Sequence, residues 1–306
     1  MTVHEIPLER RTLHGHFSRD LPPVLTIEPG DTIAFSCLDV SWHVSPGTRF
    51  QPRDERLDEG HALVGPVEVR GARAGQTLEV GIERVVTGSW GWCKAGGFST
   101  PLNDRLELAE GEGVLLEWAL GGRIGRDERG REVELAPFLG VMGMPPPEPG
   151  VHSTAPPRVW GGNIDCKELV EGTKLFLPIP VDGALFSAGD CHARQGDGEV
   201  SQVAIECPLE RGELTLSVRD DLAVALPIAW TPEAWLAFGF DEDLDEAVAL
   251  AIDGMLDIMG REHGLERREA LALASVVVDL RVTQIVNGVR GAHALLRHDA
   301  IRFTTI

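Results

Sequence analysis

Apolar and polar positions alternate along most of the first 225 residues, and this alternation predicts β-strands. Residues 24–35 read VLTIEPGDTIAF, two short runs separated by a Pro-Gly turn. Residues 67–80, VEVRGARAGQTLEV, follow the same plan, and residues 173–188 contain a third pair of runs joined by Asp182-Gly183. Because alternation with period two gives a strand one apolar face, we expect three β-hairpins within one system of sheets.

The period changes only near the end of the chain, where residues 241–259 predict a helix. Acidic residues crowd its first turn, where they suit the helix dipole. Six apolar residues share one face at helical spacing: Leu244, Val248, Ala251, Ile252, Met255 and Ile258. A second helix is expected from about residue 266 to 277, and residues 279–286 return to strand. The predicted fold class is α+β and β-dominated, with antiparallel sheets in a β-sandwich-like core and a late pair of α-helices.

These patterns predict a single domain over residues 1–306. We expect a β-rich part at 1–225, a helical insertion at about 232–278 and closing strands at 279–306. The 43% apolar content suffices for a substantial core.

The charge of the chain narrows the range of partners. Acidic residues outnumber basic ones 48 to 28, which gives a formal charge of −20. Nucleic acids and anionic membranes need a basic surface, so we expect neither as a partner. No apolar run approaches the roughly 18 residues of a membrane span, and the first 20 residues lack the apolar core of a signal peptide. We therefore expect a cytoplasmic protein that acts on a small molecule.

Cysteine usage and missing motifs exclude several classes of site. The five cysteines include no CxxC pair, which favours reduced thiols over a disulfide framework or a thiolate zinc cluster. The sequence contains no GxSxG elbow, P-loop or GxGxxG followed by a helix, so common serine hydrolases and nucleotide-binding folds are disfavoured. The acidic, β-rich composition is compatible with a homo-oligomer that covers its sheet edges.

Residues 189–199, GDCHARQGDGE, concentrate groups that can carry chemistry. Asp190 and His192 lie two positions apart on a predicted strand, so both face the same side and could bind one metal ion. The glycines that follow allow tight turning and could bring Asp197 and Glu199 back beside the strand end. The alternative is a surface hairpin with a solvated acidic tip.

Three further segments offer candidate residues. A glycine pair precedes Asn163 and Asp165 in residues 161–165, which leaves open backbone around an amide and a carboxylate. His61 lies just before a Gly-Pro turn. Trp92 could line a cleft that excludes water around a small substrate, although tryptophans are more often part of a core.

Longer runs of the sequence resemble the acetamidase/formamidase family. The resemblance spans Pro22 to His293 and is carried by residues 61–66 (HALVGP), 137–140 (PFLG), 161–179 (GGNIDCKELVEGTKLFLPI), 183–199 (GALFSAGDCHARQGDGE), 279–288 (DLRVTQIVNG) and 291–293 (GAH). It implies hydrolysis of a short aliphatic amide, such as formamide or acetamide, to a carboxylate and ammonia. It also implies a β-rich fold that is able to bind a divalent metal ion.

The resemblance also implies roles for individual residues. The metal ligands would be Asp165, Asp190 and His192, with His61 as a further ligand. Glu199 would be the catalytic acid/base, with Asp197 beside it. Apart from the resemblance, Trp92 and Asn163 are the candidates for contact with the substrate. The metal is expected to be zinc, with calcium or manganese as alternatives for a carboxylate-rich ligand set.

The sequence departs from the family pattern at three positions. Ala62 and Val64 stand where a proline and a threonine would be expected, and Arg194 is bulkier than the expected small residue. These departures leave the identity of the amide open.

Three alternative functions remain open at this stage. Asp190 and Glu199 could act without a metal, as a general acid/base pair with separated pKa values. The substrate could be a larger or cyclic amide. The chain could instead be a non-catalytic binding protein whose metal is saturated by protein ligands.

Overall fold

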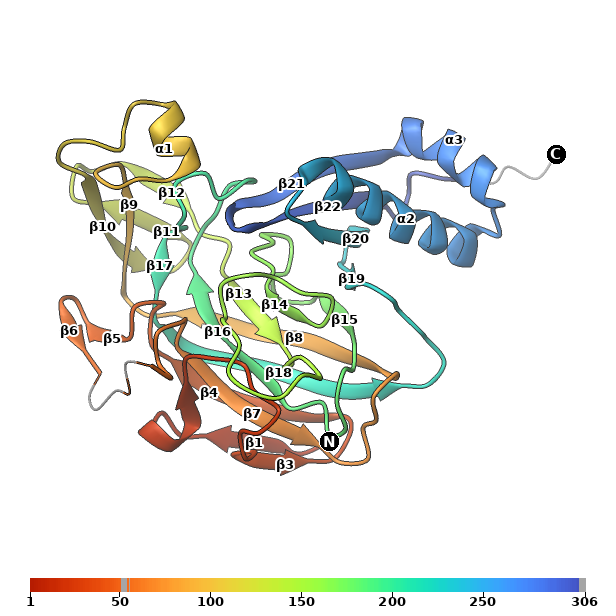
Figure 1. Ribbon diagram of the computed structural model, residues 1–306, viewed down its shortest axis with the longest axis horizontal. Coiled ribbons are helices and arrows are strands. Elements are labelled where there is room, and N and C mark those ends of the chain that lie inside the picture. The colour runs from red at the N-terminus through yellow and green to blue at the C-terminus, as the bar shows by residue number, and fades with distance from the viewer. Residues whose placement is uncertain (51–53, 55, 303–306) are drawn as a thin grey trace.

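A computed structural model describes residues 1–50, 54 and 56–302 of the chain. Two large β-sheets enclose the main hydrophobic core, which contains side chains from both sheets, among them Phe35, Val80 and Phe186. Figure 1 shows this body in the lower half of the view, with an arm of strands at the upper left and a helical lobe at the upper right. The predicted β-dominated α+β fold with two late helices is confirmed.

The first sheet, within the described residues, has nine strands in the order β1-β4-β18-β8-β15-β19-β20-β22-β21. Their bounds in this order are Val3–Ile6, Asp31–Cys37, Leu209–Arg219, Thr77–Thr87, Lys174–Pro178, Ile228–Trp230, Ala234–Asp241, Val289–Arg297 and Val278–Asn287. All neighbouring pairs are antiparallel except β1 and β4, which run parallel. The last four strands carry the helical lobe.

The second sheet has eleven strands within the described residues, and its main path is β12-β11-β10-β9-β17-β16-β13-β14. Their bounds in this order are Glu132–Glu134, Ile124–Asp127, Val114–Gly121, Trp90–Ala95, Glu206–Cys207, Phe186–His192, Phe138–Gly143 and Gly161–Asn163. Strand β7 (Leu63–Val69) pairs with β16, β2 (Leu13–His14) and β3 (Leu25–Ile27). The arm in Figure 1 consists of β9 to β12 and the short helix α1 (Pro101–Arg105). A small third sheet pairs β5 (His43–Ser45) with β6 (Thr48–Arg49).

The three expected hairpins are wrong, because each connects one sheet to the other. Strand β3 pairs with β7 in the second sheet, whereas β4 pairs with β18 in the first. Strands β7 and β8 divide in the same way, as do β15 and β16. We call two consecutive strands that lie in different sheets an arch. An alternating run has one apolar face both in a hairpin and in an arch, so the sequence pattern alone does not distinguish them.

The helical lobe forms as its apolar periodicity predicts. Helix α2 (Leu244–His263) begins at Asp243, whose side chain accepts a hydrogen bond from the backbone N–H of residue 245, and it ends at Gly264 in the left-handed region. Helix α3 (Arg267–Val277) follows directly. A Cβ on Gly239 of β20 would lie 1.9 Å from the carbonyl oxygen of Ala247, so only glycine allows α2 to pack this closely on the sheet.

The segment expected as a helical insertion therefore begins with a strand, β20, and its helices pack on β20 and β22. A 3₁₀ helix, η1 (Arg10–Thr12), precedes β2. Among the described residues, none of the helices combines the length and apolarity that a membrane crossing requires.

Candidate metal centre

Three buried side chains converge on Gly140 of strand β13. Asp190 and His192 end strand β16, which pairs with β13, and Asp165 follows β14 on the other side of β13. A Cβ on residue 140 would lie 2.6 Å from Asp165 Oδ1, 2.6 Å from Asp190 Oδ2 and 3.0 Å from His192 Cε1. Real Cβ atoms do not approach other atoms so closely, so the cluster requires glycine here.

The backbone at three of the acidic residues adopts an uncommon conformation. Asp165, Asp190 and Glu199 have φ values of 52°, 59° and 45°, in the left-handed region that non-glycine residues rarely occupy. Such conformations cost on the order of 1–3 kcal/mol each, and they concentrate at functional sites. The surrounding structure therefore holds these three carboxylates in place against a local preference.

Gln195 fixes the orientation of the His192 ring. Gln195 Nε2 donates to the carbonyl oxygen of Asp165 (2.7 Å), which leaves Gln195 Oε1 to accept a hydrogen bond from His192 Nδ1 (2.9 Å). Because Nδ1 carries this proton, Nε2 is the nitrogen that faces the acids. It lies 3.4 Å from Asp190 Oδ2 and 3.3 Å from Glu206 Oε2. A histidine that ligates a metal through one nitrogen commonly donates the other in this way.

Glu199 and Glu206 complete the cluster on the side of His192. Glu206 belongs to β17, and its Oε1 accepts a hydrogen bond from the backbone N–H of Ala204 (2.9 Å). One ligand atom each from His192, Glu199 and Glu206 lie within 4.8 Å of one another, as do ligand atoms of Asp165, Asp190 and His192. We call these five residues the carboxylate cluster.

Burial and the mutual repulsion of neighbouring acids raise the pKa values of three of the four acids in the carboxylate cluster. Burial, reinforced by the charges of Asp190 and Glu206, raises the pKa of Asp165 to about 7 despite the opposing charge of His192. Burial and the charge of Asp165 raise the pKa of Glu199 well above its ordinary value, and burial also raises the pKa of Glu206. The metal-free cluster therefore retains protons on acids that would be ionised in water.

His192 and Asp190 are shifted toward their charged forms. Burial alone would lower the pKa of His192, but the charges of Glu206 and Asp190 outweigh burial and raise it well above its ordinary value. Burial alone would raise the pKa of Asp190, but the charges of His192 and His61 lower it. These two residues form an ion pair at the centre of the cluster.

Four buried oxygen atoms of the cluster find no hydrogen-bond partner within the described part of the chain. They are Asp165 Oδ1, Asp190 Oδ1, Glu199 Oε2 and Glu206 Oε2. Leaving a buried polar atom unpaired is costly, so four of them together indicate a ligand that supplies positive charge. Carboxylates with an imidazole suit a divalent ion such as zinc or manganese, and the residues present fit such an ion.

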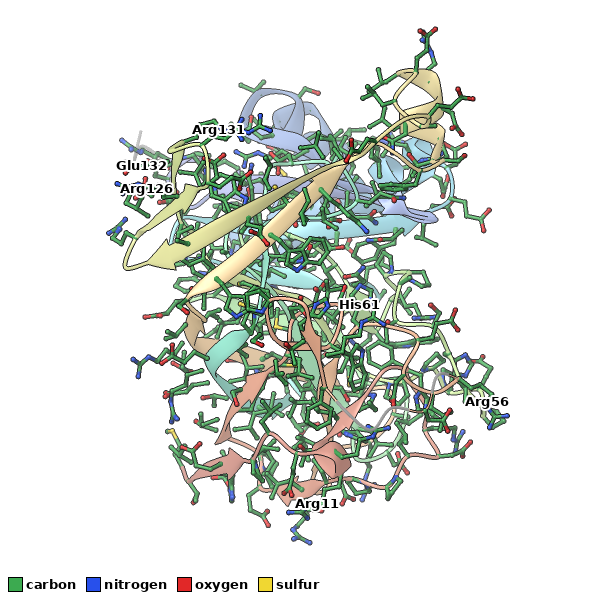
Figure 2. The ribbon with its side chains drawn as sticks, turned by 90° about the vertical axis from the view of Figure 1, so that its left-hand side faces the viewer. Arg11, Arg56, His61, Arg126, Arg131 and Glu132 are labelled. Carbon is green, nitrogen blue, oxygen red and sulfur yellow. The ribbon has the colours of Figure 1, made fainter. Side chains whose placement is uncertain are left out.

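His61, expected as a further metal ligand, lies at the edge of the carboxylate cluster. Its Nε2 is 3.9 Å from Asp190 Oδ2, and its Nδ1 lies 2.7 Å from Thr154 Oγ1. His61 also lines a cavity of about 920 Å³ together with His16 and Trp42. Figure 2 shows His61 near the middle of the molecule, away from the outward-pointing Arg11 and Arg56.

A second, smaller cavity reaches the carboxylate cluster at Glu199, the last residue of the GDCHARQGDGE stretch. It has a volume of about 230 Å³ and is lined by Glu199, Gln195, Arg194 and Cys93, among others. Arg194 is exposed there, as its size and charge suggest. A cavity smaller than the roughly 300–1,000 Å³ typical of drug-sized ligands suits a molecule of a few heavy atoms.

The structure places the other predicted site residues outside the cluster. Asp197 Oδ2 lies 2.7 Å from Lys167 Nζ, so its carboxylate forms an ion pair instead of facing His192. Trp92 donates from Nε1 to Asp39 Oδ2 (2.8 Å) and lines a different cavity with two other tryptophans. Asn163 is buried, and its Nδ2 donates to the carbonyl oxygen of residue 155 (3.1 Å).

Of the two departures near His61, Ala62 directly precedes strand β7 and Val64 lies on it, and neither lines the 920 Å³ cavity. Ala62 is fully buried, and its carbonyl oxygen accepts a hydrogen bond from Cys37 Sγ (3.2 Å). Val64 is buried on β7 opposite Ala188.

Sequence reasoning missed three residues of the site. Glu206 stands alone as a charged residue in the apolar run AIEC, a signal that could have identified it. Gln195 lies inside the GDCHARQGDGE stretch but carries no charge. Asn287 donates from Nδ2 to Asp165 Oδ2 (2.8 Å), a contact between residues 122 positions apart that no local pattern reveals.

Comparisons with known proteins identify a family and several similar chains. The model of the acetamidase/formamidase family matches the chain over residues 3–149 and again over 148–294. The crystal structure of an acetamidase from Bacillus halodurans is similar, with 28% identity, a TM-score of 0.83, and coverage of 95% of this chain and 97% of that one. The structure of a predicted acetamidase/formamidase from Thermoanaerobacter tengcongensis shares 25% identity, with a TM-score of 0.84 and coverage of 99% of each chain. A formamidase from Methylophilus methylotrophus is 24% identical over 243 residues, which are 62% of this chain and 60% of that one.

Proposed function

This chain belongs to the acetamidase/formamidase family, and from that premise we propose that it hydrolyses short linear amides to a carboxylate and ammonia at the carboxylate cluster. The observation that carries the proposal is the set of four buried carboxylate oxygens around His192 that have no hydrogen-bond partner among the described residues. Such a set is costly in a protein that only needs to fold, and it provides both metal ligands and a proton carrier. The 230 Å³ cavity at Glu199 supports a small substrate.

Asp165, Asp190 and His192 would hold a divalent metal ion, with His61 contributing from the side of the larger cavity. When bound, the ion would supply the Lewis acidity that activates water and polarises the amide carbonyl. We propose zinc as the resident ion, because a ligand set of carboxylates and one or two imidazoles suits it. Asn287 and Gln195 would orient two of the ligands, Asp165 and His192, through the hydrogen bonds described above.

Glu199 would carry the protons. Its carboxylate takes a proton from the attacking water, and the resulting carboxylic acid gives a proton to the amide nitrogen, which leaves as ammonia. The raised pKa of Glu199, caused by burial and by the charge of Asp165, suits the second transfer, because a carboxyl with an ordinary pKa would hold too little of its acid form at neutral pH. Proton transfer of this kind is typically worth roughly 10²- to 10⁴-fold in rate.

Asp197 would act indirectly. Its pairing with Lys167 fixes the loop that carries Glu199, and the backbone N–H of the intervening residue donates to the carbonyl oxygen of Thr283 (3.1 Å). We therefore assign Asp197 a positioning role beside Glu199 and no proton transfer.

The experiment is ammonia release from formamide, acetamide and propionamide, combined with the variant Glu199→Gln. We expect activity that is lost on chelation and restored by one divalent ion. Glu199→Gln should bind the same amount of metal but lose about 10²- to 10⁴-fold in kcat. Glu210→Gln, at an exposed glutamate on β18, serves as the matched control and should keep full activity.

The outcomes separate the parts of the proposal. Unchanged kcat in Glu199→Gln would remove Glu199 from the mechanism and leave the amidase assignment standing. Metal-loaded wild-type protein that releases no ammonia from any of the three amides would overturn the proposed substrate class.

A further inference from the structure

A second group of potential metal ligands begins at Cys166, the residue after Asp165 of the carboxylate cluster. Cys166 and Glu168 follow β14, and His293 lies on β22 of the helical lobe. Cys166 Sγ is 3.2 Å from Glu168 Oε2, and His293 Nε2 is 3.5 Å from the same oxygen. The three ligand atoms all lie within 4.8 Å of one another. We call Cys166, Glu168 and His293 the thiol cluster.

These separations match those of ligands around a tetrahedral zinc ion. With Zn–S near 2.3 Å and Zn–N or Zn–O near 2.0–2.1 Å, neighbouring ligand atoms are about 3.3–3.6 Å apart. The two distances to Glu168 Oε2 fall within or close to this range. A sulfur, a nitrogen and an oxygen donor together form a set that zinc binds well.

Two hydrogen bonds orient the ligands of the thiol cluster. Thr283 Oγ1 lies 2.8 Å from His293 Nδ1, so Nε2 points into the cluster. Arg281 donates to Glu168 Oε1 (2.7 Å), which leaves Oε2 facing Cys166 and His293. Outer partners of this kind fix ring and carboxylate orientation at metal sites.

The imidazole nitrogen that points into the cluster is unpaired. His293 is fully buried, and its Nε2 has no hydrogen-bond partner among the described residues. Glu168 Oε2 lies beyond hydrogen-bonding reach of Nε2 in good geometry. A buried nitrogen with no partner costs free energy unless a ligand occupies the position it faces.

A cavity borders the thiol cluster at Glu168. A cavity of about 370 Å³ is lined by Glu168 and Arg281, together with residues of β20, β21 and β22. Glu168 is the member of the cluster that is partly accessible, since its side chain is 15% exposed. Glu168 is therefore the ligand at which an ion from solvent would first meet the thiol cluster.

We propose that Cys166, Glu168 and His293 form a second metal site, which binds zinc or a similar divalent ion independently of the carboxylate cluster. Binding displaces the Sγ proton of Cys166 to solvent, so the thiolate, the carboxylate and neutral imidazole become the protein ligands. The charged groups that face the site are Glu168 itself, Arg281 and Lys167, and Lys167 is paired with Asp197. Because two cations stand near Glu168, this site binds its ion more weakly than the carboxylate cluster does.

The test replaces bound metal with Co²⁺ after chelation of the full-length protein. We expect two metal ions per chain by elemental analysis, together with a near-ultraviolet charge-transfer absorption from a thiolate bound to cobalt. Cys166→Ser should retain one ion per chain and lose the charge-transfer absorption. His293→Gln should likewise lose one ion per chain. This second variant shows whether the ion depends on the imidazole as well as on the thiol.

Cys37→Ser is the matched control, because Cys37 is as buried as Cys166 and lies outside the thiol cluster. It should keep two ions and the full charge-transfer absorption. Thermal unfolding of the chelated variants verifies that each is folded before cobalt is added. The proposal is overturned if folded wild-type protein binds one ion per chain without thiolate absorption, or if Cys166→Ser retains both features.

Discussion

The carboxylate cluster and the thiol cluster begin at consecutive residues, Asp165 and Cys166, yet their charges are balanced in different ways. Among the described residues, no lysine or arginine pairs with any of the four acids of the carboxylate cluster. Glu168 of the thiol cluster, by contrast, is held by Arg281 at 2.7 Å, with Lys167 at 4.0 Å.

Because of this difference in charge balance, the carboxylate cluster requires a bound cation or protons, whereas the thiol cluster can bind a metal ion but is stable without one. The carboxylate cluster must bind either protons or a metal ion, because uncompensated buried carboxylates are too costly. The thiol cluster is already near neutrality and retains one unpaired nitrogen. We therefore expect changes at the carboxylate cluster to alter activity and metal content strongly, and changes at the thiol cluster to alter metal content alone.

The largest expected effect comes from filling the space between the ligands. In Gly140→Ala the new Cβ would lie 2.6 Å from oxygens of both Asp165 and Asp190, so these carboxylates must move. A misplacement of about 1 Å at a catalytic group can cost roughly 10²-fold, so we expect at least that loss in kcat/KM. The measurement is ammonia release combined with metal content, which should fall by the ion of the carboxylate cluster only.

Gly121→Ala provides the control for this substitution. Gly121 also lies in a strand of the second sheet, and a Cβ there meets nothing within 4 Å. Normal activity in Gly121→Ala and in Gly140→Ala alike would show that the ligands do not converge at residue 140.

A smaller effect is expected from the hydrogen bond that reaches Asp165 from the closing strands. Asn287→Ala removes the donor to Asp165 Oδ2, and loss of such an outer partner typically weakens metal binding by roughly 10- to 100-fold. Competition with a chelator measures the affinity. Asn103→Ala, at a buried asparagine of α1 that donates to the carbonyl oxygen of Phe98, is the matched control. Equal affinities in the two variants would contradict the orienting role of Asn287.

The sequence predicted the elements of this fold better than their connections. The helical face of residues 244–258 and the return to strand after 277 follow from local periodicity. The three arches do not, because the choice between pairing alongside and pairing across the core depends on strands far away in sequence. Strand β16 shows the consequence, since its neighbours β7, β13 and β17 come from three separate regions of the chain.

The site divides in the same way between local and distant information. Asp190, His192 and Glu199 come from one stretch, and alternation along a strand was enough to pair the first two. Asp197 was grouped with Glu199 because both follow glycines, but the left-handed backbone at Glu199 turns its side chain inward while Asp197 stays at the surface. Glu206 and Asn287 enter the site through sheet pairing and a long-range hydrogen bond, which one sequence does not display.

The smallest expected effect concerns the pH dependence of stability in metal-free protein. The pKa of Asp165 is raised to about 7, so between about pH 4 and pH 7 the folded chain keeps a proton that the unfolded chain has lost. Stability therefore falls as pH rises through this window, and the raised pKa values of Glu199, Glu206 and His192 act in the same direction. Within the carboxylate cluster, Asp190 has a lowered pKa and contributes stability that is lost toward acid pH.

The variant Asp165→Asn shows how much of the pH dependence of stability comes from Asp165, because the remaining charge repulsion in this chain of formal charge −20 is nearly the same in both proteins. Because the charge of Asp165 raises the pKa of Glu199, the two groups titrate together, and the wild type should lose only about 1 kcal/mol more than the variant between pH 5 and pH 7.5. Denaturant unfolding after chelation gives both values. Added zinc should reverse the trend in the wild type, since metal binding requires deprotonated ligands and strengthens as pH rises. If the metal-free wild type instead gains stability over this range relative to Asp165→Asn, the acids of the carboxylate cluster are stabilised in their charged forms, as Glu168 is by Arg281. The proposed difference in charge balance between the two clusters would then be wrong.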